Sequence, residues 1–293
     1  MDPERYKKYF YTNKNNFSID NIDDYYGSGK GEKRAVNMAF NDMAARTLKK
    51  VSDDEGAESA GGGKETALIY LRDAFYAYFH NGGEIETVEG RKSFDVLTEE
   101  GFDEWHKAVC TEFLTLFNED NKKRYQPVAY GKAQKAVNMV FKYLYCYDGA
   151  EKYINEGYFA HCHMALDNLT LNWYKKEVAY PPTDCAWSDL KYGAYIEIQT
   201  NIRNYLKGSS SPLPSNALEA EFYVWQRERY GEDFKELAKA LAAVNDDYLQ
   251  SLSDEFIRSV RVGRERSAMD IAATIRTLDA LKARLERVKK SKK

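Results

Sequence analysis

The sequence contains few features that would place the protein outside the cell or in a membrane. Its 293 residues include four cysteines, Cys110, Cys146, Cys162 and Cys185, and none of them forms a C-x-x-C pair. No apolar run approaches the roughly 20 residues that a membrane-spanning helix requires. The first residues, MDPERYKKYF, lack the basic-then-apolar layout of a secretory signal. We therefore expect a cytoplasmic protein with free thiols and no membrane association.

An excess of one charge sign is also missing. Lys and Arg number 43 against 46 Asp and Glu, which leaves a net charge of -3. The whole molecule therefore has no electrostatic pull toward nucleic acid, and any such affinity requires a local basic patch. Hydrophobic residues make up 43% of the chain, which is enough for a real core and argues against global disorder.

Helical periodicity is common along the chain, whereas segments typical of strands are rare. We predict an all-α fold in which residues 1–263 form one helical unit and residues 264–293 a basic amphipathic C-terminal helix. Residues 81–100 contain glycines and short apolar pieces and are predicted to form a small hairpin or turns. Within the larger unit, helices are predicted near 4–11, over 33–50, 66–79, 102–118 and 133–147, after Asp167 as far as Pro181, and over 187–206 and 217–230.

One segment, residues 121–147, is basic and contains no acid. Its six cations are Lys122, Lys123, Arg124, Lys132, Lys135 and Lys142. Such a stretch indicates a surface that faces phosphates, and the alternative is a solvated basic helix face. Gly131 precedes the predicted helix, where free backbone N–H groups bind phosphate and a glycine lets the backbone approach closely.

Lys135 and Asp167 are the candidate reactive residues. Lys135 lies in the first turns of its helix, where the helix dipole and nearby Lys132 both favour a neutral amine. A neutral amine is a usable nucleophile toward a sugar C1′; the alternative is an ordinary surface lysine. Asp167 precedes an apolar-periodic helix, so that it is also a candidate N-cap. The two roles are compatible, because a capped carboxylate is held rigid and ionised and can stabilise an oxocarbenium-like sugar.

The glycine turn, the helix carrying GKAQK and the second helix that opens with Asp together resemble the helix-hairpin-helix DNA glycosylases, nearest the archaeal 8-oxoguanine DNA glycosylase branch. The resemblance covers about 45 residues, from Tyr130 to Trp173. It implies two packed helical subdomains with a cleft between them, and a hairpin and catalytic helix at about 125–175. Lys135 would be the Schiff-base lysine and Asp167 the catalytic carboxylate. The predicted DNA contacts are Lys122, Lys123, Arg124, Gly131 and Lys132.

The same resemblance implies an enzyme that flips a modified base out of double-stranded DNA and excises it. The base would be an oxidised purine or a hypermodified base such as occurs in viral DNA, so that the role is either DNA repair or antiviral defence. Lys135 would add AP-lyase activity if it attacks C1′, whereas attack by water would give a monofunctional enzyme. Candidates for the base pocket, chosen by proximity in sequence, are Tyr130, Phe159, His163 and Trp173.

The alternative function is a non-enzymatic helical protein that binds DNA or a protein partner, with a purely structural Lys135–Asp167 pair. We expect a monomer that needs no cofactor. No metal site is predicted, because the spacing of His161, His163, Cys162 and Cys185 matches no standard zinc site. Two glycine-rich stretches, GSGKG and GGGK, do not match the phosphate-binding loop of nucleotide-binding proteins.

Overall fold

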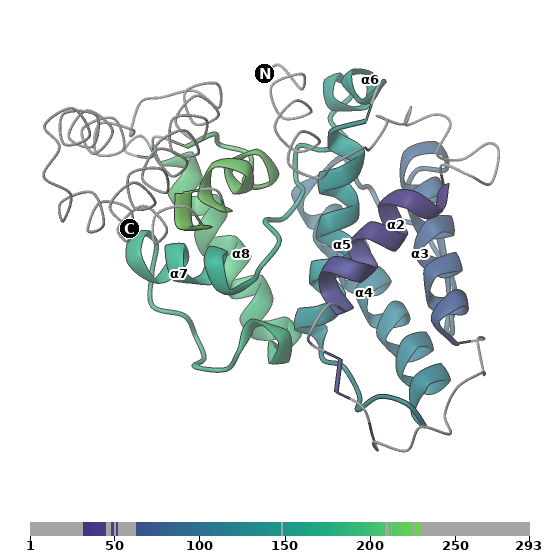
Figure 1. Cartoon of the computed structure of the whole chain (residues 1–293). Helices are drawn as coiled ribbons and strands as arrows, with labels where there is room; N and C mark the ends of the chain where they lie inside the picture. Colours follow the sequence, from purple (N-terminus) through teal and green to yellow (C-terminus); the bar gives the residue numbers. More distant parts are fainter. Residues whose placement is uncertain are drawn as a thin grey trace, which may run out of the picture.

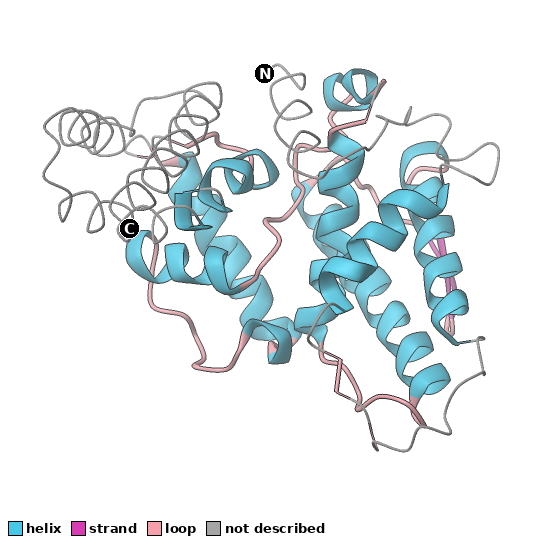
Figure 2. Ribbon diagram, viewed as in Figure 1, coloured by secondary structure: helices cyan, strands magenta, loops and turns pink. Residues whose placement is uncertain are grey.

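The computed structural model describes residues 32–44, 48–49, 51, 63–147, 149–208, 211, 213–225 and 227–229. This part of the chain is mostly helical, with one short antiparallel hairpin (Figures 1 and 2). Its helices are α2 (Glu32–Ala44), α3 (Gly63–His80), α4 (Glu99–Asn121), α5 (Tyr130–Tyr145), α6 (Ala150–Asn155), α7 (Asn168–Glu177), the 3-10 turn η3 (Trp187–Asp189) and α8 (Tyr192–Lys207), and residues 217–225 are also helical. The hairpin consists of β1 (Ile85–Thr87) and β2 (Gly90–Lys92).

Helix α5 lies at the centre of the fold. Helices α2, α3 and α4 gather on one side of it, and α7 and α8 lie on the other side (Figure 1). Of its 16 residues, all except Lys135 are buried, and it packs against α2, α4, α6, η3 and α8. A helix that is covered all round belongs to the core rather than to the surface. The polar residues of α5 must therefore find partners inside the protein.

Local sequence signals explain where the helices of the site begin. Thr98 caps α4 by accepting a hydrogen bond from the backbone N–H of Gly101 at 3.2 Å. A Cβ at Gly101 would overlap the carbonyl oxygen of Asp95, so this turn requires glycine. Asp167 caps α7 in a capping box with Thr170, which fixes the direction in which that helix leaves the preceding loop.

The prediction of a mostly helical fold is confirmed for the described residues, and so is the hairpin within 81–100. The continuous helix predicted over 187–206 is wrong. The chain forms η3, turns to extended backbone at Leu190, and begins α8 at Tyr192. The break has a physical cause, because the carbonyl of Leu190 accepts the backbone N–H of Gly131 at 2.9 Å instead of a helical partner.

Two other boundaries differ, and some predicted elements lie outside the described residues. Helix α2 is described as far as Ala44, and residues 48–49 are not helical although the predicted helix extends to position 50; residues 150–155 form α6 where a linker was predicted. The predicted helices near 4–11 and over 264–293 fall outside the part of the chain that the structure describes. All four cysteines are unpaired, and three of them are buried. Within the described ranges, no helix combines the length and the apolarity needed to cross a bilayer.

Candidate active site

Asp167 is held by the start of helix α7. Its Oδ1 accepts hydrogen bonds from the backbone N–H of Leu169 at 2.9 Å and of Thr170 at 3.1 Å. The hydroxyl of Thr170 in turn accepts the backbone N–H of Asp167 at 2.8 Å, which completes the capping box. These bonds occupy Oδ1 and leave Oδ2 to face the neighbouring helix. Asp167 is thus an N-cap and at the same time presents one carboxylate oxygen to the site.

Lys135 of α5 meets that second oxygen. Its Nζ lies 2.6 Å from Oδ2 of Asp167, and the two side chains are 12% and 13% exposed. The indole Nε1 of Trp225 donates to the same oxygen at 3.2 Å. Nζ of Lys135 also lies 5.2 Å from the ring centre of Trp187, within the range of a cation–π interaction. The two candidate reactive residues, 32 positions apart in sequence, therefore come together in a nearly closed site between two tryptophans.

The charge of Asp167 is set by two opposing effects. Burial alone would raise its pKa, because a low-dielectric environment disfavours a carboxylate. The positive charge and hydrogen bond of Lys135, together with the backbone N–H of Thr170, outweigh burial and lower the pKa below its ordinary value. Asp167 is consequently ionised at neutral pH, the state that stabilising a developing positive charge requires.

A second ion pair lies next to the first. Lys142, two turns further along α5, places Nζ 2.8 Å from Oε1 of Glu221, and these side chains are only 5% and 2% exposed. Nζ of Lys142 also lies 5.0 Å from the ring centre of Phe222 and 5.8 Å from that of Trp225. Lys142 appeared in sequence only as part of the basic stretch, and Glu221 was not predicted at all. Its one sequence signal is an acid within the apolar run ALEAEFYVW, which a surface helix would also show.

Glu221 differs from Asp167 in its protonation behaviour. Burial raises its pKa, and the negative charge of Asp167 adds to that increase, although Lys142 opposes both. Its Oε2 is buried and has no hydrogen-bond partner among the residues that the structure describes. The two carboxylates of the site are therefore pushed in opposite directions. Such a separation is typical of sites in which one acid stays charged and the other handles protons or neutral polar groups.

The predicted phosphate-binding role of Gly131 is wrong. Its backbone N–H donates to the carbonyl of Leu190 at 2.9 Å, so it is not available to a phosphate. A Cβ at this position would overlap the carbonyl oxygen of Trp187. The glycine therefore lets η3 pack directly on the start of α5, which also brings the Trp187 ring to Lys135.

Lys132 is buried as well, with 7% of its surface exposed, so that it does not form the exposed DNA contact that was predicted. Burial lowers its pKa, against the opposing charge of Asp189. Three of the six cations in the acid-free stretch, Lys132, Lys135 and Lys142, thus point into the fold rather than toward solvent. The stretch is only in part the phosphate-facing surface that its composition indicated.

The other three cations remain candidates for DNA contact. Lys122 and Lys123 are exposed in the turn that follows α4, and Arg124 is half-buried there. Lys122 pairs with Glu119 at 3.1 Å, a surface ion pair that contributes little to stability and is readily exchanged for another anion. Their role in binding DNA stays a prediction.

The four predicted base-pocket residues do not line an open site. Tyr130, Phe159, His163 and Trp173 are all buried. Phe159 packs on Phe79, with ring centres 5.5 Å apart, and Trp173 packs on Tyr205 at 5.8 Å. Proximity in sequence was a poor guide because α5 and the loop before α7 face the core on most sides. The aromatic rings beside the ion pair are instead Trp187 and Trp225.

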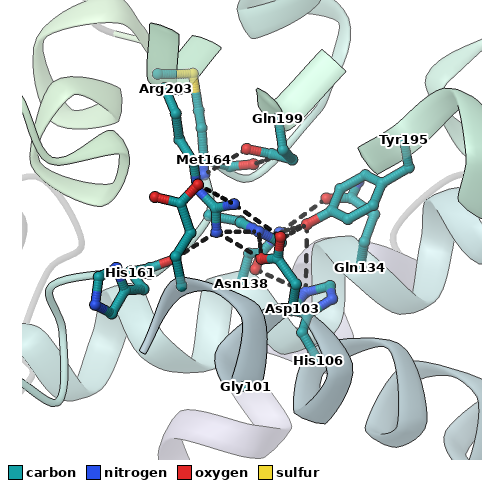
Figure 3. A network of polar contacts seen from close by, with 12 residues as sticks. Gly101, Asp103, His106, Gln134, Asn138, His161, Met164, Tyr195, Gln199 and Arg203 are labelled. Atoms are coloured by element: carbon teal, nitrogen blue, oxygen red, sulfur yellow. Dashed lines mark hydrogen bonds and ion pairs between the residues drawn. The ribbon is translucent and has the colours of Figure 1, made fainter. Parts of the chain in front are cut away.

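His163 belongs to a buried polar network with Asp103, Tyr195 and Arg203, the last three of which are labelled in Figure 3. Arg203 of α8 forms a two-point ion pair with Asp103 of α4, with N–O distances of 2.8 and 2.6 Å. His163 stands beside this pair, with Nε2 2.8 Å from Oδ1 of Asp103 and Nδ1 2.7 Å from the hydroxyl of Tyr195. The network ties the loop before α7 to both α4 and α8.

From Tyr195 the network continues into α5. The amide nitrogen of Asn138 donates to the Tyr195 hydroxyl at 2.9 Å, and its oxygen lies 3.0 Å from Nε2 of His106. Nδ1 of His106 in turn lies 3.2 Å from the hydroxyl of Tyr130. His106 therefore has neutral hydrogen-bond partners, whereas His163 stands beside the charged pair of Asp103 and Arg203; burial lowers the pKa of both histidines and favours the uncharged imidazole.

We expect this network to make the stability of the fold sensitive to mild acid. Burial lowers the pKa of His163 to about 4, against the opposing hydrogen bond with Asp103. The unfolded chain binds a proton at this histidine near pH 6.5, whereas the folded protein does not. Stability is thus fully present above pH 6.5 and falls as the pH drops toward 4, by roughly 3 kcal/mol for this group alone.

Thermal unfolding between pH 7.5 and 4.5 measures the effect. The variant His163→Gln should show a flatter dependence of melting temperature on pH than the wild-type protein. The control is His161→Gln, because His161 lies two residues away, is only half-buried and contacts the carbonyl of Leu97. If both variants keep the wild-type slope, His163 is not the group that titrates.

Among the described residues, no three His, Cys, Asp or Glu side chains gather as a metal site would require. A pocket of about 360 Å³ lies between α3 and the hairpin, and its lining includes Tyr70, Tyr76, Glu84 and Arg91 but none of the site residues discussed above. This pocket is therefore separate from the Lys135–Asp167 site. Comparison with known proteins finds no matching family model, no similar curated protein and no similar solved structure.

Proposed function

We propose that the protein is a DNA glycosylase that uses Lys135 and Asp167 to remove a modified base from double-stranded DNA. The contact between Nζ of Lys135 and Oδ2 of Asp167, 2.6 Å long and mostly buried, carries the proposal. It combines a nucleophile and an ionised carboxylate, the two groups that cleavage of an N-glycosidic bond needs near one sugar carbon. The mostly helical fold and the exposed cations that follow α4 are compatible with this activity.

The reaction begins when a sugar of the DNA binds between Nζ of Lys135 and Oδ2 of Asp167 and so separates the ion pair. Lys135 transfers a proton to water, and the neutral Nζ then forms a bond to C1′ as the bond from C1′ to the base breaks. The electron pair leaves with the base, which takes up a proton. Asp167 stays ionised and stabilises the positive charge that develops on the sugar. The new secondary ammonium then passes a proton to the ring oxygen O4′ as the bond from C1′ to O4′ breaks, which leaves a Schiff base that can eliminate the 3′ phosphate; if water attacks C1′ instead, the enzyme is monofunctional.

The groups that can hold a flipped-out base are those next to the ion pair. Enzymes read an extruded base by hydrogen bonds to its edge and by stacking on aromatic rings. Glu221 offers a buried carboxylate oxygen that has no partner within the described ranges, Lys142 offers a cation, and Trp225 offers a ring that already touches Asp167. We assign base recognition to this cluster in place of the four buried residues predicted from sequence. The substrate remains either an oxidised purine or a bulky hypermodified base, which correspond to repair and to antiviral defence.

The test is a panel of duplexes that carry oxidised, alkylated, hydroxymethylated and glucosylated bases. Wild-type protein should release at least one of these bases, and alkali should then cleave the strand at the abasic site. Borohydride added during the reaction should trap a protein–DNA adduct if Lys135 attacks C1′. If no base in the panel is released, the glycosylase assignment fails.

One observation favours the non-enzymatic alternative. Asp167 is already engaged as the N-cap of α7, so the contact with Lys135 also serves to fasten α7 to α5. A DNA- or partner-binding protein would use the pair in this way alone. It would bind the duplexes of the panel and release no base from any of them.

A further inference from the structure

Gln134, the residue before Lys135, pairs with the backbone of the residue before Asp167. Its Nε2 donates to the carbonyl of Leu166 at 2.9 Å, and its Oε1 accepts the backbone N–H of Leu166 at 3.1 Å. This exchange of two hydrogen bonds is the pattern by which one β-strand pairs with another. Here a single amide side chain from α5 takes the place of the neighbouring strand.

The remaining hydrogen-bonding capacity of Gln134 is also used. Its Nε2 donates a second bond to the carbonyl of Gly131 at 2.8 Å, and its Oε1 accepts a second bond from Asn138 at 3.1 Å. A glutamine amide has two donors and two acceptor positions, so all four are filled. Because the side chain is fully buried, rotating it would leave several polar groups without partners. The amide therefore holds Leu166 in one fixed position relative to α5.

We propose that Gln134 is a positioning residue, which holds the start of α7 so that the Asp167 carboxylate meets Nζ of Lys135. The two residues of the ion pair each follow a residue of the amide–backbone pairing directly in sequence. The distance between Lys135 and Asp167 is thus set by the contact between Gln134 and Leu166, the residues that directly precede them. The catalytic consequence rests on the proposed glycosylase function, whereas the geometric role does not.

A matched control exists on the opposite side of the same loop. Gln199 of α8 pairs with Met164 in the same manner, accepting its N–H at 3.2 Å and donating to its carbonyl at 2.7 Å (Figure 3). Gln199 is fully buried as well, but it is not adjacent in sequence to either member of the ion pair. Replacing each glutamine by methionine removes the paired backbone bonds with little change in side-chain volume, and Gln134→Met also removes the bonds to Gly131 and Asn138.

The experiment compares Gln134→Met with Gln199→Met in three measurements. Both variants should melt at lower temperature, and Gln134→Met should lose more, because it loses four buried hydrogen bonds whereas Gln199→Met loses two. Crystal structures should show Nζ of Lys135 separated from Oδ2 of Asp167 by more than about 3.5 Å in Gln134→Met only. At saturating DNA, single-turnover base release should fall roughly 10-fold or more in Gln134→Met, with the affinity for DNA unchanged. In Gln199→Met, base release should fall much less.

A second variant keeps the test decisive if Gln134→Met does not fold. A protonated glutamic acid in Gln134→Glu retains one donor and one acceptor for Leu166, so base release relative to wild type should rise as the pH falls. An intact Lys135–Asp167 contact in folded Gln134→Met, equal losses of rate in both methionine variants, or a flat relative rate in Gln134→Glu would overturn the proposal. If wild-type protein releases no base, the glycosylase function fails, and the distances in the crystal structures alone decide the positioning role.

Discussion

Lys135→Gln protein should form no borohydride-trapped adduct with any duplex from which wild-type protein releases a base. The imine forms only from an amine at C1′, and glutamine cannot supply one. The measurement is a denaturing gel of protein and labelled DNA after reduction. A matched control is Lys92→Gln on the exposed hairpin, which should trap as wild type does. An adduct that persists in Lys135→Gln would assign the nucleophile to another residue.

Asp167→Asn should show the complementary defect. Loss of the negative charge should slow base release by roughly 10²-fold or more, because the developing positive sugar is no longer stabilised. Asparagine is as good an N-cap as aspartate, so α7 and the affinity for DNA should persist. Lys135 is unchanged in this variant, so that trapping on DNA with a preformed abasic site should continue. If both variants release base at the wild-type rate, the site lies elsewhere.

The second buried ion pair should produce the largest loss of stability. Lys142→Met leaves the carboxylate of Glu221 buried without a counter-ion, and breaking one side of such a pair costs about 3–5 kcal/mol. The double variant Lys142→Met with Glu221→Met should recover most of that loss, since both charges are then gone. Urea unfolding measures the change, with Lys122→Met as the control in an exposed pair. Equal stability of Lys142→Met and wild type would show that the pair is not buried in solution.

Apolar periodicity and helix-end signals in the sequence were sufficient to predict the positions of most of the helices. The apolar stripes of α3, α4 and α5 predicted those helices to within three residues at each end, because a helix that packs on a core repeats its apolar positions every three to four residues. The break at Leu190 escaped prediction because nothing in the local sequence forces it. It depends on a hydrogen bond to Gly131, almost 60 residues earlier.

The candidate site likewise has features that follow from local sequence and features that depend on distant contacts. Lys135 and Asp167 could be singled out because each lies near a helix start, where a charged side chain has a local role, and the structure brings them into contact; their catalytic role stays a prediction. The burial of Lys132, the partnership of Lys142 with Glu221 and the ring of Trp225 at Asp167 all arise from long-range packing. The composition of residues 121–147 suggested a basic surface, because composition gives the number of charged side chains but not the direction in which each one points.

The position of α5 at the centre of the fold limits how its sequence can drift. Surface helices accept most polar exchanges on their outer face, but α5 has no such face, and its three lysines each meet a different environment. An exchange of lysine for arginine would need new space at every one of these positions. An exchange of lysine for arginine that a surface helix would accept should therefore disrupt the packing around α5. We therefore expect substitutions on α5 to be tolerated far less than substitutions in the loops and outer helices.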